Sequence, residues 1–191
     1  MIAFLKFFLY YYLMLNLVIL VLSLFAFSCT QKIEIKTEPQ THRPPGLIVA
    51  SEKAVENGKK HLRKGNCGKA IQEFNKALAK NPNNFEALYW LGVAEGMCGY
   101  YSDAYNRLTI ALRYTPDRTW EARVNASIGL ILIFMEKDDE AKIYFDRAKR
   151  IDPKNELVIQ YSEIETRGKG KKGREKINKE ESFGLILKWL D

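Results

Sequence analysis

Small and large apolar residues recur at fixed intervals through the middle of the chain, separated by polar positions. Gly58 is followed by Ala70, Phe74, Ala77 and Pro82, at steps of 12, 4, 3 and 5 residues. The same steps give two further series, Gly92, Ala104, Leu108, Ala111 and Pro116, and then Gly129, Ala141, Phe145, Ala148 and Pro153. The unit repeats after 34 residues and then after 37, and a period of this length indicates an array of stacked repeats.

The spacing inside each unit predicts two helices joined by a short turn. The 12-residue step crosses the turn, and the next three positions, at i, i+4 and i+7, share one face of the second helix. The alanines allow close approach of the helices, the large residue between them fills the gap, and the proline ends the second helix. We therefore expect helices at residues 51–64, 67–80, 84–97, 101–114, 119–135 and 138–150, and a seventh at 154–166 that covers the end of the array.

These units resemble the tetratricopeptide repeat. The matching stretches are Gly65 to Ile71, Ala77 to Asn84, Trp90 to Gly92 and Ile151 to Asn155. The resemblance implies an all-α fold, a right-handed α-solenoid of three helix hairpins with a C-terminal capping helix. It places the domain at residues 51–166, with repeats at about 51–84, 85–118 and 122–155 and the cap at 154–166.

The chain departs from the repeat pattern in its first helices. Asn57 and Asn125 replace apolar residues, and His61 and Glu95 occupy an aromatic position. Three extra residues near 117–120 lengthen the second junction.

The resemblance implies a non-enzymatic protein that binds a protein or peptide in a concave groove lined by the first helices. The positions that the resemblance places in this groove are Glu56, Lys59, Arg63, Glu86, Tyr89, Trp90, Val93, Met97, Arg123, Ser127 and Leu130. In the alternative interpretation, Tyr89 and Trp90 pack between repeats. Some family members clamp a C-terminal carboxylate with Lys, Asn and Arg; only Lys59 and Arg123 could serve here, because Val55 and Trp90 replace polar clamp residues. Binding of a chaperone tail is therefore disfavoured.

The N-terminus predicts a targeting segment. Residues 7–28 carry no charge and follow Lys6, so residues 1–28 are a signal peptide or membrane anchor. Cleavage before Cys29, with lipid on its sulfur, would resemble a bacterial lipoprotein; ordinary signal cleavage and an uncleaved anchor helix are the alternatives. We favour the first because Cys29 follows the apolar run directly. All three place the repeats outside the cytoplasm, anchored in the first case to a membrane of the cell envelope.

The segment after the apolar run predicts a flexible tether at residues 29–49, because it is proline-rich and mostly polar. Beyond the repeats, residues 167–181 form a basic linker, with seven basic and two acidic residues at 167–180. It is either a solvated connection or a contact with anionic lipid. Although the whole chain has a net charge of +7, we expect no nucleic-acid partner, because the predicted export signal removes the chain from nucleic acid.

The last ten residues predict a short amphipathic helix at 182–191. Phe183, Ile186, Leu187 and Leu190 share one helical face. We expect this segment to fold back onto the solenoid; binding in a partner's groove or lying in the membrane interface are alternatives.

Candidate chemistry is sparse. The chain has two histidines and no recognisable catalytic motif, and we expect no cofactor and no metal site. Cys67 and Cys98 lie near equivalent turns of successive repeats, so a disulfide is possible in an oxidising compartment. We favour two separate small residues over a bond.

The sequence as a whole predicts a membrane-tethered scaffold lipoprotein that mediates protein–protein interaction in the cell envelope. The alternative function is a self-associating envelope-structural protein that uses its apolar C-terminal segment. The sequence does not decide the oligomeric state.

Overall fold

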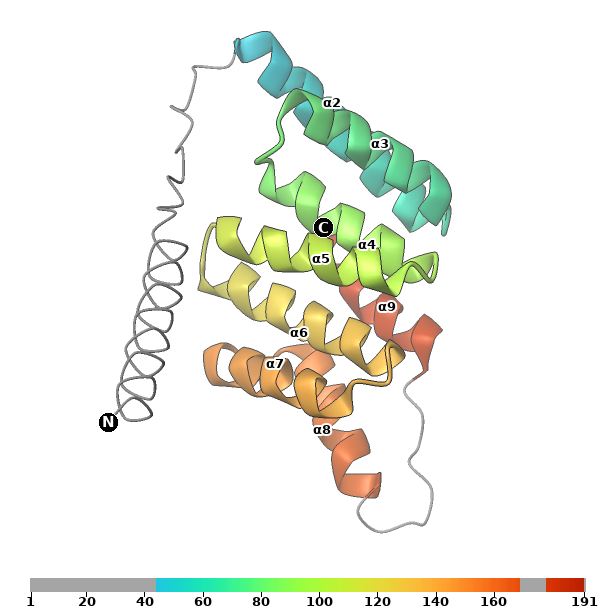
Figure 1. Ribbon diagram of the computed structural model, residues 1–191, viewed down its shortest axis with the longest axis vertical. Coiled ribbons are helices and arrows are strands. Elements are labelled where there is room, and N and C mark those ends of the chain that lie inside the picture. Colours follow the sequence, from blue (N-terminus) through green and yellow to red (C-terminus); the bar gives the residue numbers. More distant parts are fainter. Residues whose placement is uncertain (1–43, 169–177, 191) are drawn as a thin grey trace, which may run out of the picture. The chain divides into compact units, whose positions relative to one another are not determined.

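The computed structural model describes residues 44–168 and 178–190, which form a series of helices (Figure 1). Three helix hairpins follow one another and are succeeded by a further helix and a C-terminal segment. Their bounds are α2 Pro45–Arg63, α3 Cys67–Lys80, α4 Phe85–Met97, α5 Tyr101–Ala111, η1 Leu112–Tyr114, α6 Arg118–Phe134, α7 Asp138–Ile151, α8 Glu156–Gly168, α9 Lys179–Leu187 and η2 Lys188–Leu190. The expected all-α stack of three hairpins with a following helix is thus confirmed. The predicted signal segment, Cys29 and most of the basic linker lie outside the described residues.

The first helix begins earlier than expected. We predicted a tether to residue 49, but α2 begins at Pro45, so residues 45–49 are helical. Proline favours the first position of a helix, because its fixed φ suits the helix and its missing N–H would be unpaired there in any case. The two prolines that indicated a tether are therefore compatible with a helix start.

Short polar side chains begin several of the helices. The Asn84 side chain accepts a hydrogen bond from the Ala87 backbone N–H at 3.0 Å, and Asp117 accepts one from Trp120 N–H at 2.8 Å. These bonds satisfy backbone donors that have no partner within the helix. They fix the start of α4 and of α6, the two helices at the centre of the stack.

The turn inside each hairpin contains one residue with positive φ. Gly65 has a φ of 70° and Gly99 a φ of 88°, while the third hairpin uses Glu136 at 60°. The three positions repeat with the period of the array, and a residue other than glycine adopts this conformation at a cost of about 1 kcal/mol. The third turn therefore keeps the geometry of the first two although it has a glutamate in place of glycine.

Within each hairpin the mid-helix glycine receives the large residue of the second helix. A Cβ atom added to Gly58 would lie 2.5 Å from the Phe74 ring, and one added to Gly92 would lie 2.8 Å from Leu108. The third hairpin repeats this arrangement between Gly129 and Phe145, also at 2.8 Å. The flanking alanines are fully buried: Ala70, Ala77, Ala104, Ala111, Ala141 and Ala148. Pro82, Pro116 and Pro153 follow the ends of the second helices.

The C-terminal segment, α9 with η2, folds back onto the stack (red in Figure 1). Phe183 stacks on Phe134 of α6 with ring centroids 5.9 Å apart. At the far end, Arg63 of α2 donates a hydrogen bond to the carbonyl oxygen of Leu190 at 3.0 Å. The segment thus contacts the first as well as the third hairpin. Of the alternatives for these residues, folding back is the arrangement observed.

Candidate protein-binding face

The residues at the centre of the predicted groove are buried. Tyr89 and Trp90 have no exposed surface, and Val93, Ser127 and Leu130 are each 1% exposed. The expectation that the aromatic pair lines an open groove is therefore wrong for the structure as it stands. The alternative, packing between repeats, is what is seen, because α4 is the middle first helix and has neighbours on every side.

An aromatic cluster joins the second hairpin to the third. The Trp120 ring lies 5.2 Å from the ring of Phe85 and 5.2 Å from that of Tyr89, edge to face in both cases. Trp90 packs edge to face on Tyr89 with centroids 4.8 Å apart. Such pairs add to the energy of apolar burial. Sequence reasoning missed Trp120. It lies 35 residues after Phe85, whereas the array steps by 37 residues at this junction, so the repeat spacing did not indicate it.

The Tyr89 hydroxyl is satisfied inside this cluster. It shares a hydrogen bond of 3.1 Å with Ser127 Oγ, which also donates to the Arg123 carbonyl oxygen at 2.9 Å. Burial raises the pKa of Tyr89, against the lowering effects of the Ser127 bond and the Arg123 charge. Tyr89 is therefore a neutral structural link between α4 and α6.

Lys59 connects the first hairpin to the second. Its Nζ atom lies 2.9 Å from a Glu86 carboxylate oxygen and 3.2 Å from one of Glu56. Burial alone would lower the pKa of Lys59, but the hydrogen bonds and charges of Glu86 and Glu56 outweigh it and leave the pKa raised. Three predicted groove charges are thus brought together, and they hold α2 against α4.

The remaining predicted residues lie beside the C-terminal segment or are half-buried. Arg63 is exposed but bonds to Leu190, and Met97 is half-buried against the core. The Arg123 guanidinium lies over two tryptophan rings, 4.9 Å from the Trp120 centroid and 5.3 Å from that of Trp189. Cation–π contact of this kind joins the stack to the C-terminal segment.

The surface that this segment covers is here called the inner face, defined by its contact residues Arg63, Gly96, Arg123, Phe134, Glu156 and Gln160. These residues come from the first helices α2, α4 and α6 and from α8. Phe183, Ile186 and Leu190 of the segment are 4%, 1% and 7% exposed, so their apolar side chains are removed from water. Phe183 enters where α4 lacks a side chain, because a Cβ on Gly96 would lie 2.9 Å from its ring.

Polar contacts flank this apolar centre. Ser182 Oγ donates to Gln160 Oε1 at 2.9 Å, and Lys188 Nζ lies 2.9 Å from Glu156 Oε2. At the start of α9, the Lys179 ammonium lies 5.3 Å from the Tyr101 ring centroid. The segment is therefore oriented along its length as well as buried on one side.

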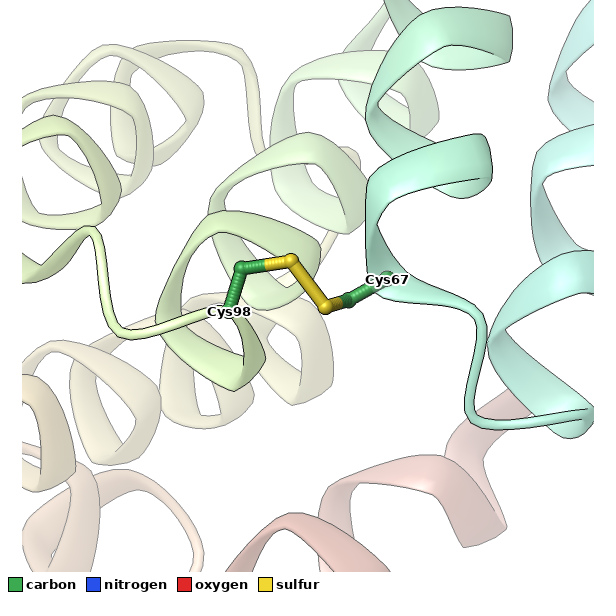
Figure 2. Close-up of a disulfide and its surroundings, with 2 residues drawn as sticks. All are labelled: Cys67 and Cys98. Carbon is green, nitrogen blue, oxygen red and sulfur yellow. A yellow bond between two sulfur atoms is a disulfide. The ribbon is translucent and has the colours of Figure 1, made fainter.

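A disulfide joins the first two hairpins beside the inner face (Figure 2). Cys67, the first residue of α3, and Cys98, which follows α4, are bonded with their Cα atoms 5.8 Å apart. Our preference for two separate cysteines was wrong. The repeat places equivalent turns of successive hairpins side by side, and a separation of 31 residues in a 34-residue period brings these two positions together.

Glu95 is a buried acid on α4. Its side chain is 9% exposed, its nearest cation is Arg107 at 3.9 Å, and its Oε2 atom has no hydrogen-bond partner. Burial raises the pKa of Glu95 to about 7, with Arg107 opposing and Asp103 assisting the shift. Asn125, the other polar replacement in the core, donates to the Glu121 carbonyl oxygen at 2.7 Å.

Two other kinds of site are absent from residues 44–168 and 178–190. The helices there are all too short or too polar to cross a membrane. Three or more His, Cys, Asp or Glu side chains nowhere gather in a metal-binding arrangement in this part of the chain.

Family models detect tetratricopeptide repeats in the chain. The model described as "TPR repeat" matches residues 58–96, and the one described as "Tetratricopeptide repeat" matches residues 122–155. No curated protein matches the sequence. Domains built from these repeats generally mediate protein–protein interaction and are typically scaffolds without enzymatic activity.

Solved structures share the fold. MamA is 24% identical, with a TM-score of 0.55 over 72% of this chain and 77% of that one. The first TPR domain of Spaghetti (RPAP3), bound to the HSP90 peptide SRMEEVD, is 17% identical, with a TM-score of 0.58 over 65% of this chain and 96% of that one. The O-GlcNAc transferase of Thermobaculum terrenum (mutant K341M) is 22% identical, with a TM-score of 0.52 over 56% of this chain, which spans only 20% of the transferase chain. The fold is therefore a tetratricopeptide-repeat solenoid.

Proposed function

We propose that the protein is a membrane-tethered scaffold of the cell envelope, which binds a protein or peptide partner on its inner face. The observation that carries this proposal is that the inner face already holds a polypeptide helix, α9. Phe183 and Ile186 of α9 and Leu190 of η2 are buried there, and the segment also makes an ion pair with Glu156 of α8 and accepts a hydrogen bond from Arg63 of α2. A surface with these properties is suited to binding a helical segment.

Two features support a location outside the cytoplasm. The apolar run at residues 7–28 ends directly before Cys29, the residue to which we assign lipid attachment. The Cys67–Cys98 disulfide supports the same location independently, because such bonds persist in oxidising compartments and are rare in the cytosol. The tethered chain would present its repeats to the periplasm or exterior.

The tether is tested by mass spectrometry of the native N-terminus and by fractionation of a Cys29→Ala variant. A diacylglyceryl mass on Cys29, with release of the variant from the membrane, is the expected result. An intact Met1 on the mature protein would overturn the lipoprotein assignment.

The binding function is tested by photo-crosslinking in intact cells. A photoreactive amino acid at position 56, an exposed site on α2 two helical turns before Arg63 of the inner face, should form a discrete adduct with a partner protein. The matched control places it at position 149, an exposed site on the second helix α7. Equal adducts from both positions, or none from position 56, would contradict the proposal.

Self-association through the C-terminal segment is the second candidate. The apolar residues that would serve it, Phe183, Ile186 and Leu190, are buried against the same chain in the structure. This arrangement favours the scaffold over the self-associating protein.

A further inference from the structure

The C-terminal segment has the properties of a bound peptide. Its helix α9 has nine residues. A helix of this length is marginal in water, so its order depends on the surface that it contacts. The chain between α8 and α9, residues 169–178, reads Lys-Gly-Lys-Lys-Gly-Arg-Glu-Lys-Ile-Asn and has two glycines and one apolar residue. The segment is therefore held to the stack by its own contacts and by a polar connection.

Its apolar contacts follow the pattern of a helix bound in a surface. Phe183, Ile186 and Leu190 occupy positions i, i+3 and i+7, and each is less than a tenth exposed. Phe183 is the aromatic anchor, stacked on Phe134 and received at Gly96. Two helices of the stack form the site that receives Phe183, because Gly96 is on α4 and Phe134 is on α6.

Its charges match those of the inner face. Lys188 pairs with Glu156 at 2.9 Å, and the segment's last described carbonyl accepts from Arg63 at 3.0 Å. Both of these contacts are made by the C-terminal end of the segment, while near its other end Ser182 donates to Gln160 at 2.9 Å. Polar contacts near both ends fix the direction in which a helix lies. An incoming helix would need a cation five residues after its aromatic anchor to make the Glu156 pair.

We propose that α9 is an intramolecular ligand, which occupies the inner face until a partner's amphipathic helix of the same pattern displaces it. The partner helix carries an aromatic residue, aliphatic residues three and seven positions after it, and a Lys or Arg five positions after it. This inference deepens the proposed function and rests on it. It makes partner binding a competition between a segment in cis and a helix in trans.

Competition from the chain's own segment determines how much more weakly a free peptide binds the intact chain. A segment joined to its binding surface by a short connection has an effective concentration on the order of millimolar. A peptide in trans that binds in the range of 100 μM would consequently bind the intact chain about tenfold more weakly than a chain whose own segment cannot dock.

The experiment uses a fluorescent synthetic peptide of residues 178–191 as the probe and the full-length chain as the receptor. Fluorescence anisotropy compares the native sequence with the double variant Phe183→Asp, Ile186→Asp, whose own α9 cannot dock. We expect the variant to bind the peptide at least about tenfold more tightly than the native chain does. Glu181→Gln, an exposed change on the same helix, is the matched control and should behave as the native chain does. A peptide carrying Phe183→Asp should not bind.

A second receptor provides a test that does not depend on correct folding of the double variant. The native chain with a protease site placed in residues 169–177 is folded first and then cut, after which the labelled peptide should exchange with the released segment. Equal affinity of the native chain and the double variant, or no binding to any receptor, would overturn the inference. So would a dimeric mass of the native chain that the double variant lacks, because α9 would then serve a second copy.

The outcomes separate this inference from the function on which it rests. If adducts form from position 56 while the peptide binds no receptor, only the intramolecular ligand is wrong. If the peptide binds as expected while position 56 gives no adduct, the cellular binding function is wrong.

Discussion

At the scale of the residue, the glycines inside the hairpins are explained by what lies against them. Gly58 faces the Phe74 ring at 2.5 Å, whereas Gly68, also helical, has nothing within 4 Å of an added Cβ. The same substitution should consequently have opposite effects at the two sites. Gly58→Ala should lower the free energy of unfolding by about 1–2 kcal/mol, since overpacking outweighs the gain in helix propensity.

Gly68→Ala is the matched control for this prediction. It adds helix propensity in open space, so it should leave stability unchanged or raise it by up to about 1 kcal/mol. Urea unfolding followed by circular dichroism measures both variants. Equal midpoints for the two would show that Gly58 is not needed for close packing.

Glu95 predicts a pH dependence of stability. Its pKa in the folded chain is about 7, against an ordinary value of 4.5. Between these values the folded state retains a proton that the unfolded state has lost, so the free energy of unfolding falls as pH rises from about 4.5 to 7. The loss contributed by this group is on the order of 2–3 kcal/mol.

The Glu95→Gln variant should remove that contribution. Its unfolding midpoint in urea should vary less between pH 5 and pH 8, and it should exceed that of the native chain at pH 8. If the stability of the native chain changes between pH 5 and pH 8 to the same extent as that of the variant, Glu95 does not titrate as described.

The roles of some residues could be predicted from the sequence and those of others could not, for physical reasons. Gly58, Phe74 and their equivalents were found because packing between two helices fixes a spacing along the chain. Trp120 was missed because contacts between hairpins leave no such interval. Tyr89 was assigned to an open groove because a family analogy does not show that Trp120 and Ser127 of the next hairpin pack against it.

At the scale of the element, helix positions followed from periodicity and ends did not. The start of α2 at Pro45 was missed because prolines indicate a tether as readily as a first helical turn. The C-terminal helix was expected from its apolar face, but an amphipathic pattern does not name the surface that it meets. The preference for two separate cysteines was wrong, because equivalent turns indicate that two residues are neighbours but do not give the distance between their Cα atoms, which is 5.8 Å.

The disulfide should stabilise the junction between the first two hairpins. It closes a loop across a sequence separation of 31 residues. Chain entropy alone gives a stabilisation of about 3–4 kcal/mol for a loop of this size. A Cys67→Ala, Cys98→Ala double variant should lose stability of this order.

Reduction provides the check on that value. Urea unfolding of the native chain with dithiothreitol should approach that of the double variant, while the variant itself should not respond to the reductant. A native chain that is equally stable with and without dithiothreitol would contradict a structural role for the bond.

At the scale of the whole folded unit, the stack and its C-terminal segment form one system. The first helices supply a surface that α9 covers. The alternative functions differ only in which molecule supplies the helix that lies on this surface. A partner, a second copy or the chain itself would each bury the same apolar positions. The central claim is that the chain covers this face with its own C-terminus.

Zero-length crosslinking tests that claim most directly. Lys188 and Glu156 form an ion pair at 2.9 Å, close enough for a carbodiimide to join them without a spacer. A mixture of chains grown with light and heavy nitrogen, crosslinked and digested, distinguishes bonds within a chain from bonds between chains. Glu156→Gln, which removes the carboxylate, is the control. We predict a Lys188–Glu156 crosslink whose two peptides always carry the same isotope; mixed isotopes, or no crosslink at this pair, would contradict the account.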